Sequence, residues 1–116
     1  MSCLFDSLSY FSSNASSQQL RNIICNYLLS NPTILDDIRV DQITEWESDT
    51  NINQYVQNMR NDHTWGSSLE IKAFSDLFKI KVNVHIDNRI VEFIPKIKPI
   101  GLINIRYTGR NHYTPI

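Results

Sequence analysis

Apolar residues recur at helical spacing near the amino end of the chain. In residues 2–11, Leu4, Leu8 and Phe11 fall on one side of a helix. A second, amphipathic helix is predicted over residues 19–30. Its apolar stripe consists of Leu20, Ile23, Ile24, Tyr27 and Leu28. The Asn-Pro pair that follows disfavours further helix, so the second helix is expected to end there.

The middle of the chain, residues 41–60, is rich in charged and amide side chains and predicts one or two helices. Its apolar residues, expected in the core, are Trp46, Tyr55, Val56 and Met59. A Trp-Gly pair then interrupts the pattern. Helical spacing resumes over residues 67–78, with Ser67 or Ser68 as the expected N-cap. The residues of this helix expected to face inward are Leu69, Ala73, Phe74 and Leu77.

After Lys79 the apolar period changes from that of a helix to that of a strand. Four segments are predicted as strands: 81–86, 89–94, 101–107 and 112–116. An Asp-Asn turn joins the first two as a hairpin. Helices first and strands last indicate an α+β fold, with a small, mostly antiparallel sheet packed between helices. A length of 116 residues fits one domain, spanning residues 1–116.

Composition narrows the classes of function. The chain is 41% hydrophobic and 20% charged, with a net charge of −1, and so has no basic surface for nucleic acid or anionic lipid. No apolar run approaches the roughly 20 residues that span a bilayer, and no signal peptide is evident. The two lone cysteines fit a reducing compartment. We therefore expect a soluble, cytoplasmic monomer that binds neither nucleic acid nor membrane.

Cys3 is the first candidate for chemistry. It stands just before an amphipathic helix, where the helix dipole and free N–H groups favour an anion. A thiolate in this place is a good nucleophile, and backbone N–H groups beside it can form an oxyanion hole. The alternative is that Cys3 is an incidental or structural thiol. Cys25 lies on the apolar stripe of its helix and is expected to be a core residue.

His112 is the second candidate, because a cysteine nucleophile needs an imidazole to take its proton and return it to the leaving group. His63 and His85 compete for this role, but both are expected at the surface. Residues two apart on a strand share a face, so Thr114 is the candidate to orient the imidazole through its hydroxyl. Thr114 is alternatively a simple β-forming residue.

No metal or cofactor site is predicted. The two cysteines and three histidines show none of the spacings of zinc sites. The three glycines of the chain leave no glycine-rich loop for phosphates.

Four blocks of the sequence together resemble the ovarian tumour (OTU) family of cysteine proteases and deubiquitinases. They are CLFDSLSYF, LRNIICNYLLSNP, YVQNMRNDHTWGSSLEIKAFSDLFKIKVNVH and NHYTPI, and they occur in the order of the family. The first resembles the helix of the nucleophile and the last resembles the closing histidine block. The resemblance implies an OTU-like fold with Cys3 as nucleophile and His112 as general base.

The same resemblance implies hydrolysis of isopeptide or peptide bonds at the C-terminus of ubiquitin or a ubiquitin-like protein, without a cofactor. Trp65 and Gly66 are expected near the channel that admits the ubiquitin tail, and Tyr113 beside it. Backbone N–H groups around Ser2 and Cys3 are expected to hold the oxyanion.

Two positions depart from the pattern of the family. The family usually has Asp-Gly-Asn before its cysteine, whereas Met1 and Ser2 precede Cys3 here. It also usually has Asn or Asp two residues after its histidine, where this chain has Thr114. Together these differences keep open a weak or inactive OTU-like module that binds ubiquitin. A viral protease that also processes its own polyprotein is a further alternative. Abundant Asn and Ile with scarce Gly also suggest an A/T-rich, viral or parasitic genome.

Overall fold

The computed structural model describes residues 3–11, 15–35, 37–109 and 112–116, which form five helices and six strands. The helices are α1 (Cys3–Tyr10), α2 (Ser17–Leu29), α3 (Val40–Ser48), α4 (Ile52–Met59) and α5 (Ser68–Phe78). The strands are β1 (Thr33–Leu35), β2 (Ile38–Arg39), β3 (Ile80–Ile86), β4 (Arg89–Phe93), β5 (Gly101–Thr108) and β6 (His112–Pro115).

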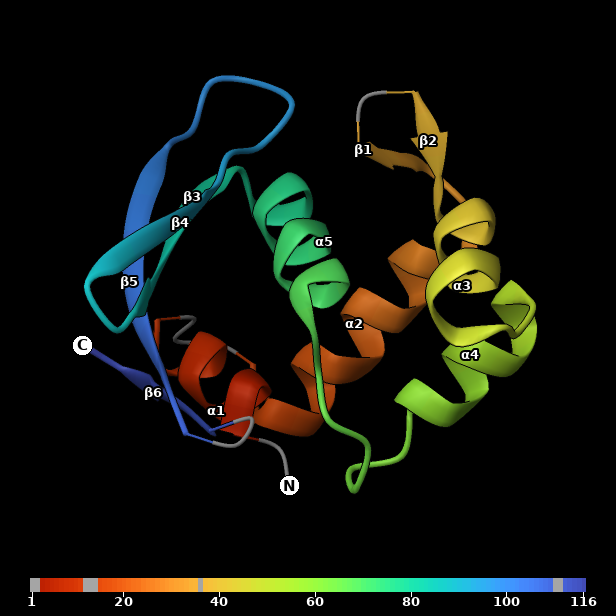
Figure 1. The fold of residues 1–116 in the computed structure, drawn as a ribbon, viewed down its shortest axis with the longest axis horizontal. Coiled ribbons are helices and arrows are strands. Elements are labelled where there is room, and N and C mark those ends of the chain that lie inside the picture. The colour runs from red at the N-terminus through yellow and green to blue at the C-terminus, as the bar shows by residue number, and fades with distance from the viewer. Residues whose placement is uncertain (1–2, 12–14, 36, 110–111) are drawn as a thin grey trace.

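The last four strands form one sheet in the order β4-β3-β5-β6 (Figure 1). The β3–β4 and β5–β6 ladders are antiparallel, and the β3–β5 ladder between them is parallel. The predicted β3–β4 hairpin is confirmed. The short strands β1 and β2 form a separate antiparallel pair, which the sequence pattern did not predict. The predicted α+β class with a small, mostly antiparallel sheet is confirmed.

Local sequence signals explain where the longest helices begin. Ser16 caps α2 through a reciprocal capping box with Gln19. Ser67 is the N-cap of α5, and the Glu70 carboxylate accepts bonds from its backbone N–H and its hydroxyl, which settles the N-cap in favour of Ser67 over Ser68. At the other end of α5, Lys79 adopts a left-handed conformation that lets the chain leave the helix and enter β3 directly.

One apolar core joins the helices to the sheet. Val82, Val84, Ile103 and Ile105 point from β3 and β5 toward the helices and are at most 7% exposed. In Figure 1, α1 and α5 lie next to this sheet, whereas α3, α4 and the β1–β2 pair lie on the far side of α2 and α5.

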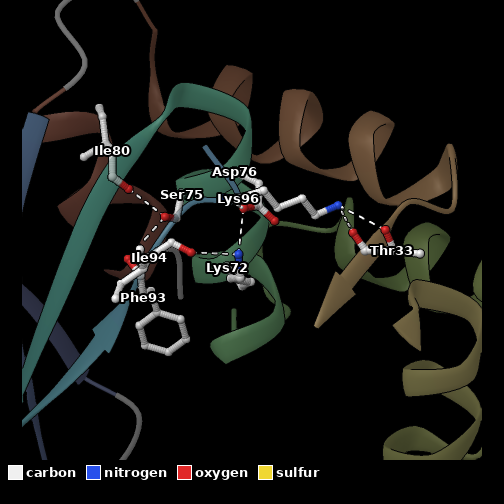
Figure 2. A network of polar contacts seen from close by, with 8 residues as sticks. All are labelled: Thr33, Lys72, Ser75, Asp76, Ile80, Phe93, Ile94 and Lys96. Atoms are coloured by element: carbon white, nitrogen blue, oxygen red, sulfur yellow. Dashed lines mark hydrogen bonds and ion pairs between the residues drawn. The ribbon is translucent and has the colours of Figure 1, made fainter. Parts of the chain in front are cut away.

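A polar network fastens the connection between β4 and β5 to the helices (Figure 2). The Asp76 carboxylate, on α5, accepts a bond of 2.6 Å from Lys72 Nζ and one of 3.0 Å from the Lys96 backbone N–H. Lys72 Nζ also donates to the carbonyl of Ile94 at 2.9 Å, and Lys96 Nζ donates to the carbonyl of Thr33 in β1. The network therefore links α5, the β4–β5 connection and the β1–β2 pair.

The predicted apolar stripe is correct in period but wrong at particular residues. On α2, Ile23 is 39% exposed, while Arg21 is fully buried. On α3, Trp46 is 66% exposed instead of lying in the core. The predicted core residue Cys25 is fully buried, and Val56 and Met59 are at most 3% exposed.

Candidate active site

Cys3 is the first residue of α1, and its side chain is half-buried. The helix continues directly from it: the hydroxyl of Ser7, one turn on, donates to the carbonyl of Cys3 at 2.8 Å. The thiol therefore belongs to the first turn of a helix, where backbone N–H groups have no partner within the helix and favour a negative charge. This is the position that the sequence predicted for a nucleophile.

His112 is the first residue of β6, and its side chain is exposed. The strand lies at the edge of the sheet and pairs with β5 alone, with His112 opposite Thr108. Thr114 shares the alternation of His112, lies opposite Arg106 and is half-buried. An exposed imidazole on an edge strand has few packing contacts, so its rotamer can change at little cost.

The structure packs α1 directly against β6, and Figure 1 shows the starts of both elements at the same end of the molecule. Tyr113, next to His112, shows how close the two elements are. Burial raises the pKa of Tyr113 to about 12, and the negative charges of Tyr107 and Cys3 contribute further. Tyr113 packs on Tyr107 with ring centroids 4.9 Å apart and faces the core. Residues from opposite ends of the chain therefore meet here.

The competing histidines have other partners. His85 Nε2 lies 2.9 Å from the side-chain oxygen of Asn104, across the β3–β5 ladder. His63 Nε2 lies 3.5 Å from the carboxylate of Asp62, in the exposed turn after α4. Neither lies on the strand that packs against α1.

The Trp-Gly turn reaches the start of α1 from a third direction. Gly66 approaches so closely that a Cβ atom there would lie 2.5 Å from Leu4 Cδ2 and 3.1 Å from Phe5 Cε2. Any larger residue at this position would force the buried Leu4 side chain to move, so glycine permits the close approach. Trp65, beside it, is 41% exposed. Ser2, which we expected at the oxyanion site, lies outside the described residues.

An open pocket of about 440 Å³ lies on the other side of this turn, between it and α3 and α4. Its wall includes Glu47, Thr50, Tyr55, Asn58, Trp65 and Ser67. A smaller pocket of about 130 Å³ lies next to it between α3 and α5, and Glu47 also lines that pocket. Polar and aromatic groups thus line a hollow beside the predicted substrate channel.

Sequence reasoning missed the buried charges behind this site. Arg21 and Glu70 are both fully buried. Burial raises the pKa of Glu70 and of Tyr55, its hydrogen-bond donor, and lowers the pKa of Arg21. The Ser-x-x-Glu spacing of Ser67 and Glu70 is a signal that could have marked Glu70 as a partner of Ser67. No local signal marks Arg21 as buried, because basic residues on helices usually face water.

An α+β scaffold that sets a thiol-bearing helix against a strand beginning with imidazole has the parts of a cysteine hydrolase. Residues 2–112 match the family of OTU-like cysteine proteases. The chain therefore belongs to the OTU-like cysteine protease family.

Solved structures agree with this assignment. The chain is similar to an OTU domain solved in complex with ubiquitin, with a TM-score of 0.77 and 25% identity over 98% of this chain. It covers 62% of the length of that domain's chain. It also has the fold of the OTU domain of OTUD1 (TM-score 0.70, 13% identity, covering 98% of this chain and 77% of that one).

An OTU deubiquitinase from Wolbachia pipientis wMel has the same fold, with a TM-score of 0.69 and 20% identity over 98% of this chain and 80% of its own. The search of curated proteins finds no match. Among the helices of the described residues, none has the length and apolar character needed to cross a bilayer.

Proposed function

We propose that this chain is a thiol-dependent deubiquitinase that hydrolyses the bond at the C-terminus of ubiquitin or a ubiquitin-like protein. The observation that carries the proposal is the packing of α1, which begins with Cys3, against β6, which begins with His112. Family membership and the likeness to an OTU domain solved with ubiquitin support the choice of substrate.

In the proposed reaction, the His112 imidazole removes the Cys3 proton and the thiolate attacks the carbonyl carbon of the terminal glycine. Backbone N–H groups at the start of α1 hold the resulting oxyanion. His112 then gives its proton to the leaving amine, and a thioester remains on Cys3. Water, deprotonated by His112, attacks the thioester and releases the ubiquitin carboxylate and the free thiol.

Thr114 is the proposed partner that orients the imidazole, since it shares the alternation of His112 on β6. Its neutral hydroxyl can accept a hydrogen bond from the ring but offers no charge to stabilise the imidazolium. Trp65 and Gly66 are proposed to form one wall of the slot for the ubiquitin tail.

The second candidate function is a module that binds ubiquitin without hydrolysing it. One observation favours it: His112 and Tyr113 alternate to opposite faces of β6, and Tyr113 is the one packed toward the core and Cys3. The proposed enzyme therefore requires the His112 side chain to reach around the edge of β6 toward the thiol.

A ubiquitin probe with a thiol-reactive group at its C-terminus separates the two functions. The enzyme is expected to form a covalent adduct that maps to Cys3 and disappears in Cys3→Ala. Cys25→Ala is the matched control, because Cys25 is fully buried and its adduct yield should be unchanged. Noncovalent binding of ubiquitin by the folded wild-type chain without any adduct would support the second candidate instead.

A further inference from the structure

Two oppositely charged side chains are buried directly behind the start of α1. Arg21, on α2, and Glu70, on α5, each have no exposed surface. Their charges interact, since the Glu70 carboxylate is one of the groups that favour the protonated form of Arg21. Burying charge is unfavourable unless it is well paired, and apolar residues of the same size would often be more stable. The pair therefore calls for a reason beyond stability.

Arg21 connects α1 to the end of α4. Its guanidinium lies 4.2 Å from the centroid of the Phe5 ring, two residues after Cys3. Its Nη1 donates to the carbonyl of Met59 at 2.7 Å, and its Nη2 donates to the carbonyl of Asp62 at 3.5 Å. The planar, forked guanidinium makes these contacts together, which a lysine ammonium cannot do.

Glu70 fastens the other end of the same segment. Its Oε1 accepts bonds of 2.7 Å from both the backbone N–H and the hydroxyl of Ser67. Its Oε2 accepts a bond of 2.6 Å from the hydroxyl of Tyr55, on α4. Ser67 is therefore tied to both α4 and α5.

Residues 59–67 are thus held at the beginning by Arg21 and at the end by Glu70. Between these two points the Trp65–Gly66 turn packs on Leu4, with space for no side chain at Gly66. The two buried side chains thus contact both ends of the segment that carries this turn.

We propose that Arg21 and Glu70 are positioning residues that hold the Trp65–Gly66 turn at a fixed separation from Cys3, and so set the width of the slot for an extended peptide tail. This inference rests on the proposed function for its substrate. Its structural part, the position of the turn, can be measured without any substrate.

The test uses the fluorescence of Trp65. The chain has two tryptophans, and Trp46→Phe on the surface of α3 leaves Trp65 as the only one. In this background, Arg21→Lys and Glu70→Gln should each raise the quenching of Trp65 by acrylamide by about half or more, because a segment that loses its anchors opens locally. Ile34→Val, a buried change in β1 away from the turn, is the control and should leave quenching unchanged.

A kinetic test accompanies it. In the same two variants, kcat/KM for a fluorogenic ubiquitin substrate should fall about tenfold or more, while alkylation of Cys3 by iodoacetamide stays within about twofold. Iodoacetamide does not need the slot, so its rate reports the thiol alone. Arg21→Met should lose more activity than Arg21→Lys, since methionine can pack on Phe5 but carries no charge and donates no hydrogen bond.

Unchanged Trp65 quenching in the Arg21 and Glu70 variants would overturn the positioning role. A loss of activity no larger than the fraction of unfolded protein, as expected for Ile34→Val, would overturn it as well. If the Arg21 and Glu70 variants do not fold, Tyr55→Phe removes only the hydroxyl that donates to the Glu70 carboxylate, and it must still raise Trp65 quenching. If wild-type protein does not react with ubiquitin, the proposed function fails while the quenching result still decides the positioning role.

Discussion

The two elements that carry the proposed chemistry are held in place by different forces. On α1, Leu4, Phe5 and Leu8 are at most 1% exposed and pack among the sheet, α2 and the Trp-Gly turn. On β6, a strand of four residues, the backbone pairs with β5 alone and His112 is exposed. The thiol is therefore positioned by close packing, whereas the imidazole is positioned by a backbone ladder. Substitutions around the thiol should disturb the fold, whereas substitutions of the imidazole should disturb only the reaction.

The largest expected effect comes from His112→Ala. Turnover of a ubiquitin substrate should fall by about 10²- to 10⁴-fold, the usual contribution of a general base. The free energy of unfolding should change by no more than about 0.5 kcal/mol, because the side chain is exposed. Steady-state kinetics and urea unfolding measure the two quantities. His63→Ala, an equally exposed change, is the control and should leave turnover intact; near-normal turnover in His112→Ala would remove His112 from the mechanism.

Gly66→Ala tests the close packing around α1. The new methyl would collide with the buried Leu4 side chain, so the protein should lose about 1–3 kcal/mol of stability, the usual cost of overpacking. Gly101→Ala is the matched control, since a Cβ there meets only Ile80 at an ordinary 3.8 Å. Equal urea midpoints for the two variants would show that α1 is held less tightly than its contacts indicate.

Cys25, the thiol buried behind α1, gives the packed region a pH dependence. Burial raises the pKa of Cys25 from 9.0 to about 11. Between these values the folded protein binds more protons at this site than the unfolded chain, so stability must fall as pH rises. The loss between pH 8 and pH 10 should be about 1 kcal/mol. In Cys25→Ala, the free energy of unfolding measured by urea titration should decline less steeply between pH 8 and pH 10. The same decline in both proteins would contradict the burial of this thiol.

The smallest effect is expected at Thr114, on the strand β6. Thr114→Asp supplies the carboxylate that the threonine hydroxyl lacks, so turnover should stay the same or rise. Thr114→Val, which keeps the shape of threonine but removes the hydroxyl, is the companion variant. A tenfold loss in Thr114→Asp, equivalent to about 1.4 kcal/mol in the activation free energy, would mean that the hydroxyl has a role of its own.

Local sequence pattern determined the elements of this protein and their approximate bounds. The period of apolar residues predicted α1, α2, α5 and the four strands of the main sheet, because helices and strands expose one face with a fixed repeat. Ser67 and Ser68 were both predicted as the N-cap of α5, and the structure has Ser67; the four ordered blocks pointed to the family. The β1–β2 pair, at two and three residues, is too short to produce a pattern of its own.

Only the tertiary structure decided which individual side chains are buried and which distant segments are in contact. Arg21 is buried because other elements surround it, namely Phe5 on α1 and the carbonyls of Met59 and Asp62 at and after the end of α4. Trp46 is exposed because no other element among the described residues covers most of it. The meeting of α1 with β6 joins the two ends of the chain, a contact between residues about as far apart in sequence as the chain allows. Periodicity is a property of neighbours along the chain, whereas a site built from distant segments depends on how whole elements pack, and this packing fixed which of the predicted residues lie together.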